Sequence, residues 1–118
     1  MFTDKYFRIW TGPFPFNDAS VRQNAPATSG VYQILYLGEI VYIGISSSSI
    51  RGRLIKHVTG HGNWAAARRA NAEGYEFVYF LCDATSASQI ESHVLTNDPP
   101  PFNVKPEYKN FIDNITVH

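Results

Sequence analysis

The chain has 118 residues and a mass of 13.3 kDa, which is enough for one domain. Hydrophobic residues make up 44% of it and charged residues 17%, a globular composition that excludes a wholly disordered chain. The formal net charge is zero at pH 7, which argues against a nucleic-acid binder that relies on a generally basic surface.

Basic residues gather in the middle of the chain. Residues 30–70 carry five basic side chains and one acidic side chain, whereas residues 71–118 carry two basic and seven acidic ones. A site for a polyanion is therefore expected between residues 50 and 70. The single cysteine, Cys82, cannot form an internal disulfide, and no segment has the pattern of a membrane helix or a signal peptide. We expect a cytoplasmic protein with no membrane-spanning segment.

The first 29 residues are rich in proline and aromatic residues and show no clear period. We predict an irregular arm over residues 1–29 that packs on a main domain of residues 30–118. The main domain opens with two runs that predict a β-hairpin, from Gly30 to about Tyr36 and from Ile40 to Ile45. Leu37 to Glu39 form the expected turn.

The rest of the chain predicts helices and one more strand. Four serines, ending at Ser49, precede a helix over Ile50–Val58 that Gly60 terminates. An alanine-rich helix is expected from Asn63 to about Gly74, and a strand over residues 76–82. Ser86 and Gln89 form a capping-box pattern for a last helix, which must end at the prolines 99–101. This order predicts a small α+β domain.

The hairpin places two tyrosines as candidate functional residues. With a three-residue turn, Tyr36 pairs with Ile40, Ile34 with Tyr42, and Tyr32 with Gly44. Tyr32 and Tyr42 then share one face of the sheet, and Gly44 leaves space where a substrate backbone could approach. A two-residue turn would put the tyrosines on opposite faces. The alternative interpretation is that both tyrosines only pack, because aromatic residues are common in strands.

The serine run and the helix after it offer two further features. Hydroxyls and free amides at a helix N-terminus form a natural anion site, although a flexible polar loop would look the same. Arg53 and His57 are four residues apart and are neighbours on one side of the helix, at the edge of its apolar arc. Arg51 falls within that arc, so periodicity alone does not favour Arg53 over Arg51. A solvated basic face would give the same pattern.

The last helix contains one unusual carboxylate. Its apolar arc consists of Ala87, Ile90, Val94 and Leu95, and Glu91 lies inside it. A buried carboxylate is costly unless it meets a cation, a metal or strong donors. Glu91 is therefore either a partner in an ion pair with Arg51 or Arg53, or a metal ligand.

These residues follow one another in a recognisable order. Gly30-Val31-Tyr32 is followed by Tyr42-Ile43-Gly44, with ten residues from Tyr32 to Tyr42, and Arg53, His57, Glu91 and Asn103 come after. In this order the chain resembles the GIY-YIG endonuclease family over about residues 29–104. The resemblance implies a three-stranded antiparallel sheet flanked by helices, and a metal-dependent endonuclease that hydrolyses phosphodiester bonds in DNA.

The resemblance also implies roles for individual residues. Tyr32, Tyr42, Arg53 and His57 match the catalytic positions, and Glu91 matches the ligand of one divalent ion, Mg²⁺ or Mn²⁺. The match favours Arg53 over Arg51 and favours the three-residue turn. Supporting or substrate-binding roles are expected for the remaining candidates, which are Gly44, Ser46, Arg51 and Asn103.

The chain departs from the family pattern in two ways. Val31 replaces the usual isoleucine, which is a trivial change, and Ile45 stands where many relatives carry a lysine. The loss of that lysine removes a cation near the phosphate, a role that could shift to Arg51. No specificity domain is recognisable. The alternatives are therefore a weak or inactive nucleic-acid-binding module of the same fold, or a partner-binding protein that uses the N-terminal arm.

Overall fold

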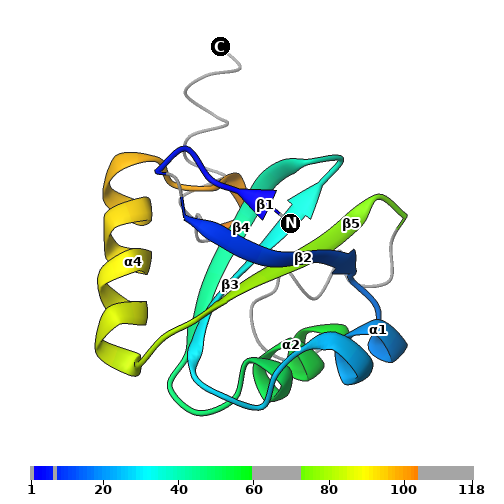
Figure 1. Cartoon of the computed structure of the whole chain (residues 1–118). Coiled ribbons are helices and arrows are strands. Elements are labelled where there is room, and N and C mark those ends of the chain that lie inside the picture. Colours follow the sequence, from blue (N-terminus) through cyan, green and yellow to red (C-terminus); the bar gives the residue numbers. More distant parts are fainter. Residues whose placement is uncertain (1, 7, 60–72, 104–118) are drawn as a thin grey trace.

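One antiparallel sheet organises the molecule (Figure 1). The computed structural model describes residues 2–6, 8–59 and 73–103. Five strands form the sheet in the order β1-β2-β5-β3-β4. The strands are β1 (Phe2–Thr3), β2 (Ile9–Pro15), β3 (Gly30–Tyr36), β4 (Glu39–Ser46) and β5 (Tyr75–Leu81). The described helices are α1 (Asp18–Asn24), α2 (Ile50–Val58), α4 (Ala84–Asn97) and the short 3-10 helix η1 (Pro101–Asn103).

The expected α+β class is correct, but the prediction of a three-stranded sheet is wrong. The two extra strands come from the N-terminal segment, which was expected to be irregular. In β2 the side chain of Trp10 is fully buried and its neighbours are exposed, as in a half-buried strand. Prolines 13 and 15 obscure this alternation in the sequence, and the pairing of β2 with β5 shifts between Thr11 and Phe14. The division of the chain at residue 29 stays a prediction.

The N-terminal segment also contains a helix that was not predicted. Asn17 caps α1, and its side chain accepts a hydrogen bond of 2.8 Å from the backbone N–H of Ser20. Two of the seven residues of α1, Ser20 and Val21, are buried. A helix this short is marginal on its own, so α1 depends on its packing against the rest of the fold.

The β3–β4 hairpin differs from its prediction at the turn. Tyr36 pairs with Glu39, so the turn has two residues, and both have positive φ angles, +50° at Leu37 and +87° at Gly38. The register then shifts by one residue at Val41, and Ile34 pairs with Tyr42 as expected. The pairing of Tyr32 with Gly44 is also confirmed, whereas the predicted pairing of Tyr36 with Ile40 is wrong.

The later elements agree with the sequence more closely. Helix α2 has the predicted bounds, and the Ser49 hydroxyl accepts from the N–H of Gly52 at 3.0 Å. Helix α4 ends before the prolines as expected, but it starts earlier than predicted. Its N-cap is Asp83, whose carboxylate accepts from the N–H of Ser86 at 2.7 Å. The predicted helix cap at Gly60, the helix from Asn63 and the tail beyond residue 103 lie outside the described residues.

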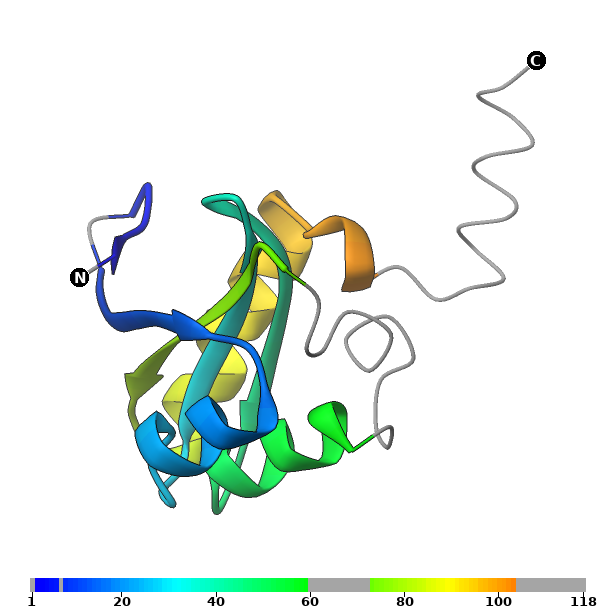
Figure 2. The same ribbon diagram turned by 90° about the vertical axis from the view of Figure 1, so that its right-hand side faces the viewer.

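Two apolar clusters lie on the two faces of the sheet. Tyr32 and Ile34 of β3 pack with residues of α1 and α2, whereas Val31 and Leu35 pack with residues of α4. Figure 2 shows α1 and α2 lying together, apart from α4. We call these faces the α2 face and the α4 face. None of the described helices has the length and the apolar character that crossing a bilayer needs.

Candidate active site

A buried hydrogen bond joins the sheet to helix α2. The hydroxyl of Tyr32 in β3 lies 2.7 Å from Nε2 of His57 in α2. Both side chains are only 1% exposed. Tyr42 completes a cluster of three rings, with centroids 6.2 Å from Tyr32 and 5.8 Å from His57. The sequence therefore predicted correctly that Tyr32 and Tyr42 share a face, and the structure adds that His57 lies deep in the α2 face.

Gly44 makes room for the ring of Tyr32. A Cβ atom built at Gly44 would collide with Cζ and Oη of Tyr32. The space above Gly44 was expected to admit a substrate backbone, and this expectation is wrong because the tyrosine ring itself fills it. Any larger residue at position 44 would have to displace the Tyr32 hydroxyl, so the glycine fixes where that hydroxyl lies.

The electrostatic surroundings keep both tyrosines neutral. Burial raises the pKa of Tyr32 well above its ordinary value, the Tyr42 hydroxyl adds to the rise, and the nearby charge of Arg53 opposes it. Burial also raises the pKa of Tyr42, against the effects of Tyr32 and Arg53. A free phenolate at neutral pH is therefore disfavoured at either position.

Arg53 lines an open groove and also interacts electrostatically with Tyr32 and Tyr42. The groove has a volume of about 440 Å³ and is lined by the serine loop, Gly52, Arg53 and Lys56. The Ser46 hydroxyl accepts from the N–H groups of Ser48 and Ser49, at 3.3 and 2.9 Å, and so shapes that loop. This arrangement places two cations and a polar loop together, which suits an anionic group.

Lys56 is a residue of this groove that was expected only as part of the basic block between residues 50 and 70, with no site role of its own. It follows Arg53 by three residues, so the two side chains lie on the same side of α2. That spacing was the available signal.

Arg51 is not brought to this groove. Its Nε donates a hydrogen bond of 2.7 Å to the backbone carbonyl of Ala25, the residue that caps the C-terminus of α1. The guanidinium therefore braces α1 against α2, because it binds a carbonyl at a helix end. The expectation that Arg51 takes over a phosphate-binding role is not supported by this position.

Glu91 of α4 is half-buried and close enough to Arg53 and Tyr42 to interact with them electrostatically. Burial raises the pKa of its carboxyl, and the charge of Arg53 opposes the rise. The apolar arc of α4 is displaced from its predicted position, since Leu95 is 37% exposed. Among the described residues Glu91 has no ion-pair partner. The described part of the structure thus contains no close ion pair of Glu91 with Arg51 or Arg53, although the charge of Arg53 acts on its carboxyl.

Asn103 in η1 contacts the strand that carries Tyr42. Its side-chain oxygen accepts from the N–H of Ile43 at 2.9 Å, and its side-chain nitrogen donates to the carbonyl of Ile43 at 2.8 Å. Ile43 lies between Tyr42 and Gly44, on the outer edge of the sheet. Both ends of the amide are used for the backbone, so Asn103 is placed to hold this strand.

A comparison with protein families decides the relationship. The model of the GIY-YIG catalytic domain matches residues 28–101. The chain belongs to the GIY-YIG family. This is a family of nucleases, and the family resemblance inferred from the sequence is confirmed.

Solved structures agree with this assignment. The GIY-YIG N-terminal endonuclease domain of UvrC from Thermotoga maritima, bound to magnesium as its catalytic divalent cation, aligns with a TM-score of 0.57 at 21% identity. That match covers 71% of this chain and 96% of the UvrC domain. A tyrosine-to-phenylalanine point mutant of the same domain, bound to its catalytic divalent cation, gives 0.56 and 21%, with 72% and 96% covered. At this identity the likeness shows a common fold. No curated protein matches the sequence.

Proposed function

We propose that this GIY-YIG domain is a metal-dependent endonuclease that hydrolyses phosphodiester bonds in DNA. The observation that carries the proposal is the buried Tyr32–His57 hydrogen bond, with Tyr42, Arg53 and Glu91 around it. Hydrolysis needs a group that takes a proton from water, a cation that binds the phosphate, and stabilisation of the added negative charge. The cluster offers a residue for each of these tasks.

The tyrosine and the histidine act together in this proposal. The raised pKa of Tyr32 disfavours a phenolate waiting for substrate, so the hydroxyl must lose its proton as it accepts one from water. His57 Nε2, at 2.7 Å, is the acceptor for that proton. Two protons thus move in one direction, from water to Tyr32 and from Tyr32 to His57, and no exposed phenolate is needed.

Access to Tyr32 depends on Arg53 in this mechanism. Tyr32 is almost fully buried, while Arg53 is exposed and interacts with its hydroxyl. A guanidinium binds phosphate through two parallel hydrogen bonds. Movement of Arg53 onto the scissile phosphate would uncover the tyrosine hydroxyl and admit the water. Lys56 and the loop that Ser46 shapes would hold the flanking phosphate.

The surroundings of Glu91 fit a hard divalent cation. Within the described part of the chain no three His, Cys, Asp or Glu side chains come together as a metal site. Mg²⁺ keeps several waters and is often bound through one or two carboxylates plus substrate phosphates, so a single half-buried carboxylate suits it. Glu91 would hold Mg²⁺ or Mn²⁺, which when bound neutralises charge that develops on the phosphate. The support for this assignment is that Glu91 is half-buried and has no close ion pair among the described residues.

One observation favours a second candidate, a nucleic-acid-binding module without turnover. Ile45 packs with the apolar cluster of the α4 face, so the chain lacks the cation that many relatives carry after the second motif. Lys56 lines the same groove as Ile45 and supplies a cation from another element, which is why we favour the enzyme.

Cleavage of a labelled DNA duplex tests the proposal. The parent protein is expected to cleave with Mg²⁺ or Mn²⁺ and not with EDTA, and Glu91→Gln is expected to bind the duplex without cleaving it. A matched control is Gln89→Leu, on the exposed side of α4. Branched, nicked, single-stranded and RNA substrates belong in the same assay. Binding without cleavage of any substrate by the parent would support the inactive module instead.

A further inference from the structure

A second cavity lies on the opposite face of the sheet from Tyr32. It has a volume of about 360 Å³ and lies between the N-terminal segment, the end of α4 and the tip of the β3–β4 hairpin. Gln33 of β3 contributes to its lining. Since successive residues of a strand point to opposite faces, Gln33 faces α4 whereas Tyr32 faces α2. The cavity is therefore separate from the candidate active site.

Gln33 is a buried polar side chain in an otherwise apolar part of the sheet. It is 2% exposed, and its Oε1 has no hydrogen-bond partner among the described residues. Buried polar atoms are nearly always paired, so an unpaired acceptor needs an explanation. The same cavity is lined by apolar side chains, which include Phe2, Ile40 and Val94. A ligand that carries an N–H donor on an apolar body would satisfy both features.

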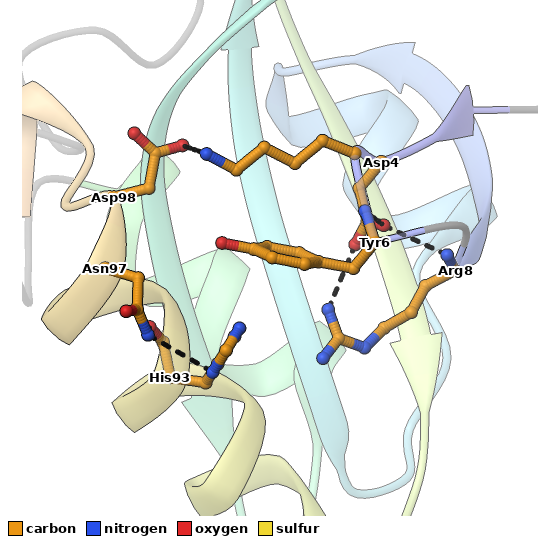
Figure 3. A network of polar contacts seen from close by, with 7 residues as sticks. Asp4, Tyr6, Arg8, His93, Asn97 and Asp98 are labelled. Atoms are coloured by element: carbon orange, nitrogen blue, oxygen red, sulfur yellow. Dashed lines mark hydrogen bonds and ion pairs between the residues drawn. The ribbon is translucent and has the colours of Figure 1, made fainter.

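The wall that the N-terminal segment forms is well braced (Figure 3). The carboxylate of Asp4 accepts from the N–H groups of Tyr6 and Arg8 and from the indole of Trp10, at 2.8, 3.0 and 3.0 Å. The ring of Tyr6 contacts His93 of α4 edge-on, with centroids 4.7 Å apart. These contacts fix the turn against α4, so the cavity is a built feature of the fold.

The charges around the cavity select between classes of ligand. Its lining contains Asp4, Glu39 and Asp98 against Lys5, which is three negative groups and one positive group, a net charge of −2. Arg8 balances Asp4 at 3.2 Å, and Lys5 pairs with Asp98 at 2.8 Å across the rim. Among these described charges, the exposed carboxylate of Glu39 is left without a balancing positive charge. This surplus disfavours phosphates and carboxylates and favours a cation.

We infer that this cavity binds a small organic cation with a flat apolar body and N–H donors, such as an amidinium or a protonated aromatic amine. One N–H group of the cation donates to Oε1 of Gln33, the apolar body lies against Phe2 and Val94, and the carboxylate of Glu39 attracts the cation from the rim. The inference does not depend on the nuclease activity proposed for the other face.

Benzamidine is a suitable probe, and benzoate is its matched control with the same ring and the opposite charge. Titration by ¹⁵N-HSQC NMR is expected to shift the resonances of Gln33, Gly38 and Val94 with benzamidine and to leave them unchanged with benzoate. Gln33→Leu removes the acceptor and keeps the bulk, so it should weaken benzamidine binding by about tenfold or more. Gln23→Leu, on the exposed side of α1, should bind as the parent does.

The stability of the ligand-free protein gives an independent readout. Gln33→Leu is expected to raise the melting temperature, because an apolar side chain has no acceptor to leave unpaired. Glu39→Lys changes an exposed residue without threatening the fold, and should also weaken benzamidine binding. Equal binding of benzamidine and benzoate, unchanged binding by both variants, or shifts confined to other residues would overturn the inference. Absence of any benzamidine shift would show that the cavity holds only water.

Discussion

Replacement of Tyr32 by phenylalanine removes one oxygen from the centre of the candidate active site. The ring keeps its place over Gly44, so packing is preserved. The hydrogen bond to His57 Nε2 is lost, and the histidine is 1% exposed, so water cannot replace the missing hydroxyl. Leaving a buried ring nitrogen without this hydrogen bond costs about 1–3 kcal/mol, and we expect Tyr32→Phe to destabilise the fold by that amount.

A double-mutant cycle separates the hydrogen bond from other effects. His57→Leu alone leaves the Tyr32 hydroxyl without this partner, whereas the double variant Tyr32→Phe/His57→Leu removes both polar groups. The coupling free energy between the two positions is expected to be about 1–2 kcal/mol, within the usual range for contacting residues. Urea denaturation followed by circular dichroism measures it, provided the m value stays constant. Strict additivity would refute the hydrogen bond as a stabilising contact.

The same substitution tests the proposed proton transfer. Tyr32→Phe should lower the cleavage rate by roughly 10²–10⁴-fold, the usual contribution of general acid–base catalysis. Single-turnover conditions with saturating protein isolate the chemical step, and duplex affinity should change little. A variant that cleaves at a near-parental rate would show that a different group activates the water.

Three further predictions concern other residues of the candidate active site and its groove. The folded-state pKa of Glu91 is raised, so the folded state favours the protonated carboxyl. Protonated Glu91 therefore contributes to the free energy of unfolding at low pH, and this contribution is lost as the pH rises through the folded-state pKa. Glu91→Gln should therefore raise metal-free stability at pH 7 and leave it nearly unchanged at about pH 3, below the ordinary pKa of about 4.3; the reverse order in thermal melts would contradict the raised pKa. Gly44→Ala should destabilise by about 1–3 kcal/mol through overpacking and reduce cleavage as strongly as Tyr32→Phe, and a folded, fully active variant would show that the ring position is unimportant. Lys56→Ala should reduce the slope of log K against log salt for duplex binding by about 1, whereas Arg22→Ala on α1 should not, and equal slopes would remove Lys56 from the phosphate groove.

The sequence predicted the strand partners of Tyr32 and Tyr42 correctly, although the predicted length of the turn was wrong. A three-residue turn and a two-residue turn followed by a one-residue bulge add the same number of residues between Ile34 and Tyr42. The face on which a side chain lies depends only on that count, so the error cancels beyond Val41. The burial of His57 was underestimated because a helical wheel shows which residues share a side and not what the sheet places against them.

Features that depend on distant parts of the chain could not be predicted. Strand β2 pairs with β5, more than 60 residues later, and its prolines hide the alternation of its side chains. The cavity beside Gln33 exists only because the segment before β2 folds over the sheet towards α4. Periodicity does not favour Arg53 over Arg51, and what separates them is tertiary: Arg51 bonds the carbonyl of Ala25, whereas Arg53 lines the groove.

The amide of Asn103 takes the place of a neighbouring strand. Strand β4 is at the edge of the sheet, and an open edge invites pairing with another chain. The side chain of Asn103 bonds both the N–H and the carbonyl of Ile43, next to Tyr42, and so occupies the backbone groups that another strand would pair with. A chain shortened to end before residue 103 would expose these backbone groups, and its first effect would be self-association along β4 rather than the loss of a reacting group.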